Sequence, residues 1–471
     1  MKNVLGVIGL FVLLSQNTMA LSEKAVLVRC YAQITGKAIP LNHSLYLDVK
    51  SGKTKAIDAC LSVLHKADLQ SNGQLKDTSP ETVAIFNNFY DFHRTWFPTA
   101  NKDQILGYQG EFDSNTDNFI ELTTPALTIT RALFGGMNYS EILRGSNSYS
   151  PMRGNPSAIN ISTTDPSDNV KTTPIMAPFV GTGPTTGITT TTESLILTNY
   201  SIPNIGSAVG SGAQTGIDLY RALGGGILGQ QGYFLLDVGH SKGQIFDGAL
   251  KLPRKWAKTA LESLLCFNLP ALRESDIQQY INAGAEVPFR RAGSCITCHA
   301  TMDQMATTAR NLVVAETADG NFQKVIFTGS YPANRQAISE WSSSSVPNFH
   351  RQTPTGKLMI RSYVNGALIN QDVNGLEDLG TKLSNLDEMY QCAAKRYFEY
   401  FTGINVSLYD RSDPANAHLN KTLSKRDLND RRFIEQLGRD LRATQSLPKM
   451  IESILRSDYY NKIQFNPESG Q

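Results

Sequence analysis

Apolar residues recur at intervals of three and four along much of the chain, which is the spacing of an amphipathic helix. The clearest example follows Ser79, which is suited to cap a helix, and Pro80, which is suited to its first turn. Five residues then share one face before Pro98 ends the segment: Val83, Phe86, Tyr90, His93 and Phe97. Because His93 lies on this apolar face, we expect it to be a hydrogen-bonded core histidine rather than a ligand.

The same spacing predicts further helices and therefore a mainly α protein. A glycine, Gly403, is well placed to end the longest of them. Short strands are expected at 325–327 and 358–360. The further helices are expected at both ends of 22–66, over 125–144 with a break at Gly135 and Gly136, and over 253–266, 275–283, 376–401, 430–441 and 448–459.

The middle of the chain breaks this pattern, because residues 146–215 are dense in Ser, Thr, Gly, Asn and Pro. Such a segment has little side-chain area to bury, so we expect a long loop with a β-hairpin around 194–200. A lid over a functional site is the alternative. The predicted organisation is an N-terminal helical domain at 21–145, this insertion, a third domain at 216–375 that contains the motif described below, and a C-terminal helical domain at 376–471.

The first 20 residues have the pattern of a secretory signal peptide. Lys2 is followed by an apolar core at 4–14 and by a small-residue cleavage site that ends at Ala20. The apolar run is short for a membrane span, and no later segment is apolar enough to be one. We therefore expect a periplasmic or secreted protein. Its formal net charge of +2 gives no indication of a nucleic-acid surface.

The chemistry of the chain centres on a Cys-x-x-Cys-His sequence made by Cys295, Cys298 and His299. This is the signature of one covalently attached haem c, since the two thiols add to the porphyrin vinyl groups and the imidazole ligates the iron. A redox dithiol and half of a zinc site are the alternatives. The dithiol needs no adjacent His, and the zinc site would need a second pair of ligands. Covalent haem attachment occurs outside the cytoplasm, so the export signal supports haem.

Other positions could complete the haem site. Arg290, Arg291 and Arg361 could hold the propionates through charge-assisted hydrogen bonds, with ordinary surface charge as the alternative. Met359 is the predicted distal ligand, because small cytochromes c take this ligand from a loop tens of residues after the proximal His. His350, in the same loop, is the second candidate. The alternative for Met359 is a core position in a short strand.

Four cysteines remain, an even number for an oxidising compartment. We predict a Cys30–Cys60 disulfide, which would link two nearby helices. We also predict a Cys266–Cys392 disulfide, which would tie the helix before the haem motif to the long helix after it. The two other pairings, and four free thiols, stay open as alternatives.

Several segments of the second half resemble a family of planctomycete-type cytochrome C-like proteins, which are exported bacterial proteins of several consecutive domains. The likeness covers about residues 220–460 and, more faintly, 80–145. Gln304 stands where the family usually has Pro. The resemblance implies a c-type cytochrome domain without an established reaction. The segments are GILGQQGYFLL at 226–236, LESLLCFNLP at 261–270, CITCHATMD at 295–303, LDEMYQCAAKRYFEYFTGI at 386–404 and SLPKMIESILRSDYY at 446–460.

We therefore expect an electron carrier rather than a stand-alone enzyme, working with an unidentified redox partner protein in the cell envelope. A single haem motif argues against di-haem peroxidases and multi-haem wires. A haem-dependent enzyme or sensor with an open sixth coordination site is the alternative, and an envelope binding protein with a structural haem is a third. No Gly-x-Ser-x-Gly or His-Glu-x-x-His motif points to hydrolysis.

Overall fold

A computed structural model describes most of the N-terminal and C-terminal parts of the chain and several pieces of its middle. These parts are mainly helical, which confirms the predicted fold class. The predicted signal peptide, His350 and the hairpin expected around 194–200 lie outside them. The described residues are 20–97, 123–154, 158–163, 171–176, 183–191, 223–237, 253–285, 290–310, 312–317, 325–330 and 353–462.

The N-terminal helices form where the sequence predicts, although α4 ends at Arg94 and Phe97 lies beyond its end. The hydroxyl of Ser79 accepts the N–H of Thr82 at 3.3 Å, and Pro80 stands in the first turn of its helix. Gly135 and Gly136 separate a helix from a short 3₁₀ helix, as expected. The elements are α1 (Glu23–Thr35), α2 (Ser44–Lys50), α3 (Ala56–Leu64), η1 (His65–Ala67), α4 (Pro80–Arg94), α6 (Thr124–Phe134) and η2 (Tyr139–Leu143).

The single long helix predicted at 376–401 is wrong, because two helices occupy this segment. Leu386 has an extended backbone (φ −82°, ψ 138°), and Tyr390 and Arg144 donate hydrogen bonds to the carbonyl and hydroxyl of Ser384. Gly403 ends the second helix in the left-handed region (φ 72°), as predicted. The C-terminal elements are α13 (Gly375–Leu383), α14 (Asp387–Thr402), η8 (Pro414–Asn416), α15 (Ala417–Asn420), α16 (Lys425–Thr444), α17 (Leu447–Arg456) and α18 (Asp458–Asn461).

The central part of the chain combines short helices with four antiparallel strand pairs in the described ranges. The strands predicted at 325–327 and 358–360 are confirmed. The helices are η4 (Gly226–Gly229), α7 (Gln231–Asp237), α9 (Arg254–Leu265), α10 (Glu274–Ile277), η5 (Gln278–Tyr280), α11 (Gly293–Ala306) and η7 (Thr307–Ala309). The pairs are β1 (Ser148–Pro151) with β4 (Ile188–Thr191), β2 (Ala158–Thr163) with β3 (Lys171–Met176), β5 (Leu312–Thr317) with β6 (Val325–Ser330), and β7 (Thr355–Arg361) with β8 (Leu368–Asn374).

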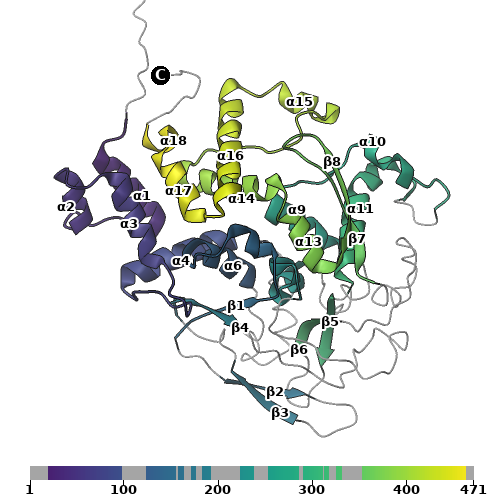
Figure 1. The fold of residues 1–471 in the computed structure, drawn as a ribbon, viewed down its shortest axis with the longest axis horizontal. Helices are drawn as coiled ribbons and strands as arrows, with labels where there is room; N and C mark the ends of the chain where they lie inside the picture. Colours follow the sequence, from purple (N-terminus) through teal and green to yellow (C-terminus); the bar gives the residue numbers. More distant parts are fainter. Residues whose placement is uncertain are drawn as a thin grey trace, which may run out of the picture.

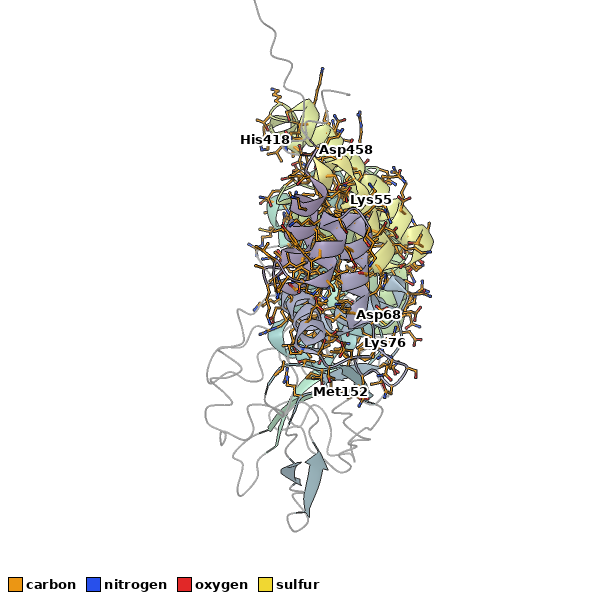
Figure 2. All side chains as sticks on the ribbon, turned by 90° about the vertical axis from the view of Figure 1, so that its left-hand side faces the viewer. Lys55, Asp68, Lys76, Met152, His418 and Asp458 are labelled. Carbon is orange, nitrogen blue, oxygen red and sulfur yellow. A yellow bond between two sulfur atoms is a disulfide. The ribbon has the colours of Figure 1, made fainter. Side chains whose placement is uncertain are left out.

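One continuous cluster of buried side chains extends from Val26 to Tyr460 and crosses the domain boundaries expected at 145 and 375. Helices from the N-terminal and C-terminal parts of the chain pack against α14. Arg29 and Gln33 of α1 each donate to the carbonyl of Phe401 at 2.8 Å, and α16, α17 and α18 contact α14. The helices form the upper part of the molecule, and β1 to β6 lie below them (Figure 1). In the side view, Lys55 and Asp458 lie in the helical part, and Met152 lies at its lower edge (Figure 2).

Both predicted disulfides are confirmed. Cys30 of α1 is bonded to Cys60 of α3, with 6.0 Å between their Cα atoms. Cys266, which follows the last residue of α9, is bonded to Cys392 of α14, with 5.3 Å between their Cα atoms. The first bond therefore joins two N-terminal helices, and the second joins the helix before the Cys-x-x-Cys-His sequence to the centre of the core.

His93 is a buried, hydrogen-bonded core residue, as predicted. Its Nδ1 lies 2.8 Å from the hydroxyl of Thr130 on α6, and its Nε2 lies 2.6 Å from the hydroxyl of Tyr397 on α14. The ring thus joins three helices. Complete burial lowers the pKa of His93 to about 3, because the charged imidazolium would lose its hydration there.

Acidification is expected to destabilise the protein through His93. In the unfolded chain His titrates near pH 6.5, so the unfolded state binds the extra proton as the pH falls from about 6.5 toward 3. Between pH 7 and pH 5 this lowers the free energy of unfolding by about 2 kcal/mol. Urea unfolding at both pH values measures this loss in the wild type and in His93→Gln, which lacks the titrating group. Equal losses in the wild type and the variant would contradict the assignment.

Candidate functional site

Helix α11 carries the Cys-x-x-Cys-His sequence from its first turn onward. Ala292 sets its start, because its backbone is extended (φ −120°, ψ 130°) and its carbonyl accepts the N–H groups of Cys295 and Ile296, each at 3.1 Å. Gly293 allows this start to lie close to α10, since a Cβ there would be 3.3 Å from the carboxylate of Glu274.

The residues of the motif and the residues that pack against the protein interior lie on different faces of α11. Ile296 and Ala300 are fully buried and contact the small cluster formed with Leu272 and Ile277. The half-buried side chains recur at i, i+3, i+4 and i+7, which places them on one stripe of the helix. These side chains are Cys295, Cys298, His299 and Met302. Helical periodicity therefore brings both thiols and the imidazole to the same face.

The buried carboxylate of Asp303 contacts the imidazole of His299 at Nδ1. Nδ1 of His299 lies 3.3 Å from an Oδ atom of Asp303, one helical turn further along. Arg254, at the start of α9, donates to both oxygens of this carboxylate, at 2.5 Å and 3.1 Å. The side chain of Asp303 is only 3% exposed. The bidentate contact with Arg254 therefore fixes the carboxylate against the ring.

The ionised form of Asp303 is favoured. Burial alone would raise the pKa of this carboxyl, but hydrogen bonds from His299 and Arg254 and the charge of Arg254 bring it below its usual value. With Nδ1 engaged by Asp303, Nε2 is the ring nitrogen suited to ligate a metal.

The two thiols of the motif are both free and half-buried, so they are not joined to each other. Burial raises the pKa of Cys298, and the neighbouring Cys295 raises it further, against a hydrogen bond from Thr297. Redox dithiols have a reactive thiol of lowered pKa, so Cys298 lacks this property.

Of the three predicted propionate partners, Arg290 interacts electrostatically with Asp303, the residue that contacts His299. Its pKa is lowered by burial, and the charges of Asp303 and Arg254 act on it in opposite directions. Arg291 is exposed and donates to the carbonyl of Ala285 at 2.6 Å. Arg361 donates to the carboxylate of Asp276, with Nε at 2.8 Å, and its charge is balanced there.

Met359 is a fully buried residue of strand β7. This is the core position in a short strand that was predicted as the alternative to a ligand. Its side chain belongs to the cluster of Ile296 and Ala300, on the packing face of α11. Its carbonyl accepts a hydrogen bond from the hydroxyl of Thr301 at 2.7 Å. The structure thus places Met359 on the packing face, away from the stripe of Cys295 and Cys298.

The pairing of Asp303 with Arg254 was not expected from the sequence. The role of Asp303 could have been predicted from its spacing, because a residue four places after His299 on a helix lies beside it. The role of Arg254 could not have been predicted, since this residue is remote in sequence and reaches the site only because α9 packs against α11.

These donors fit a covalent haem c. The attachment chemistry needs two reduced thiols two residues apart and an adjacent imidazole, and all three lie half-buried on one helical face. Metal-ligating histidines commonly donate their other ring N–H to a carboxylate, and Asp303 accepts from His299 in this way.

Comparison with known proteins identifies no relative: no family model, no curated protein and no solved structure matches the chain. Among the helices of the described ranges, none is both long enough and apolar enough to cross a membrane.

Proposed function

We propose that this chain is an exported mono-haem c-type cytochrome that transfers electrons in the cell envelope. The observation that carries the proposal is the stripe on α11, where two reduced thiols and a carboxylate-backed imidazole lie side by side. The signal-peptide pattern before Ala20 supports the location, and the Cys-x-x-Cys-His sequence supports the cofactor.

Each residue then has a defined role. The sulfur atoms of Cys295 and Cys298 would hold the haem through thioethers, made by addition of their S–H groups across the two vinyl groups. Nε2 of His299 would ligate the iron, while Asp303 accepts the hydrogen bond of Nδ1–H and fixes the ring orientation. Arg254 holds Asp303 in place. Haem supplies a one-electron couple when it is bound.

Arg290 is the favoured propionate partner, because it lies within the electrostatic group of Asp303 and Arg254. Its guanidinium would add positive charge at the same end of α11 where the motif begins. Arg361 is disfavoured for this role, since it already binds Asp276.

A second function is favoured by one observation. Met359 lies on the packing face of α11 rather than on the stripe, which leaves the proposed sixth coordination position without that ligand. A hydrogen bond from Nδ1 to a carboxylate also makes the ring a stronger donor, as suits a ferric or more oxidised iron. The second candidate is therefore a haem-dependent enzyme or sensor with an open sixth site.

Intact mass tests the proposal. The mature protein, exported from cells that attach haem c, is expected to carry one added haem of about 616 Da. The Cys295→Ser/Cys298→Ser variant is the control and should have the mass of the bare chain. A bare-chain mass for the wild type would refute covalent haem.

Carbon monoxide binding then distinguishes the two candidate functions, since rapid binding to the reduced protein requires an open sixth site.

A further inference from the structure

A cavity of about 870 Å³ lies apart from the Cys-x-x-Cys-His motif. The ends of α4 and α9, the middle of α14 and the loop at 405–416 enclose it, and no residue of 290–310 lines it. Its volume falls in the range of pockets for small organic molecules. Aromatic residues contribute to its lining, among them Phe92, Trp96 and Tyr400.

Three of the cations that line this cavity are balanced by carboxylates. Arg273 donates to Asp410, with Nε at 3.1 Å. Arg361 binds Asp276, and Lys395 lies 2.7 Å from the carboxylate of Glu399, one helical turn away. The charge of each of these three cations is therefore balanced by a neighbouring carboxylate.

Arg396 differs from them, because within the described part of the chain no carboxylate lies within ion-pair distance of it. Its guanidinium lies over the ring of Trp96, 4.9 Å from the centroid, and Nη2 donates to the carbonyl of Glu262 at 3.2 Å. Nε is buried without a hydrogen-bond partner, and so is Nε1 of Trp96. Arg396 lines the cavity, and its Nη1 makes no hydrogen bond among the described residues.

This arrangement is costly to the folded protein. Burial lowers the pKa of Arg396 to about 10, which reflects the desolvation of its charge. A desolvated cation without an anion destabilises the folded state, whereas an anion of matching geometry offsets this cost. A guanidinium is suited to bind a carboxylate through two parallel hydrogen bonds.

We propose that this cavity binds a small organic carboxylate. The carboxylate pairs with Arg396, and the body of the molecule lies against the aromatic wall of Phe92, Trp96 and Tyr400. A carboxylate is favoured over a neutral ligand because Arg396 is the lining cation without an ionic partner in the described residues. The site is independent of haem, since its lining residues and those of the α11 stripe are different.

The first test needs no ligand. Arg396→Met removes an unbalanced charge, so the melting temperature of the variant is expected to equal or exceed that of the wild type. Arg273→Met is the matched control in the same cavity, and it is expected to melt several degrees lower because it leaves Asp410 unpaired. A loss for Arg396→Met as large as the control's would show a structural role and overturn the proposal.

The second test uses phenylacetate, with phenylacetamide as its neutral isostere, on the full-length exported protein. At concentrations about tenfold above its dissociation constant, phenylacetate is expected to raise the melting temperature of the wild type by about 1 to 3 °C. Phenylacetamide should leave it unchanged, as should phenylacetate with Arg396→Met or Arg396→Gln. An unchanged wild type in phenylacetate, or equal protection of these variants, would overturn the proposal.

Discussion

Asp303→Asn is expected to raise the reduction potential of the attached haem by about 60 to 120 mV. Asp303 accepts the hydrogen bond of His299 Nδ1 and gives the ring a more anionic character, which stabilises ferric iron over ferrous. Loss of such a partner changes metal binding by about 10- to 100-fold, and tenfold corresponds to about 59 mV for one electron. An amide keeps the shape of the side chain but removes its charge.

Redox titration followed by absorption measures this shift. Asp276→Asn is the matched control, because Asp276 is also a buried carboxylate bound by an arginine but lies away from His299. Asp303→Glu should recover part of the wild-type potential, since it restores the charge. A shift no larger than that of the control would refute the role of Asp303. A wild type without covalent haem would instead refute the proposed function.

Removal of the Cys266–Cys392 disulfide is expected to lower the free energy of unfolding by about 5 kcal/mol. The bond closes a loop with a sequence separation of 126 residues, and in the chain-entropy model so long a loop restricts the unfolded state strongly. The same model gives roughly 3 to 4 kcal/mol for Cys30–Cys60, whose separation is 30 residues.

Urea unfolding of the two double Cys→Ala variants, compared with the wild type, measures both losses. The order of the two losses in free energy is a more decisive criterion than their size, because the two bonds differ mainly in loop length. A larger loss for Cys30–Cys60 than for Cys266–Cys392 would contradict the loop-length explanation. The second bond also anchors α9, so its loss is expected to loosen the contact of Arg254 with Asp303 as well.

Local signals in the sequence were enough to place many of the helices. The cap at Ser79 and the stop at Gly403 act within one turn of the chain, so their effect can be read without the fold. The break between α13 and α14 could not be read in this way. Leu379, Leu383 and Leu386 keep the helical spacing across it, and the contacts that mark the break come from the distant Arg144 and from Tyr390.

The candidate site was predictable only where its residues are neighbours in sequence. Cys295, Cys298 and His299 form a local motif, and the helix then brings them to one face. Arg254 reaches Asp303 only through the packing of two helices, which no spacing rule anticipates. The position of Met359 also depends on packing, because the partners that bury it belong to α11 and to the segment before it.

The attachment of α1 to α14 has a consequence for the order of events during synthesis and during the proposed export and haem attachment. Arg29 and Gln33 bind the carbonyl of Phe401, which lies 372 and 368 residues further along the chain, so α1 cannot complete its packing until that segment has emerged. Cys295 and Cys298 emerge during this interval, well before α14. We therefore expect the thiols to meet the attachment machinery on an extended, open chain, and closure of the core to follow haem attachment rather than precede it.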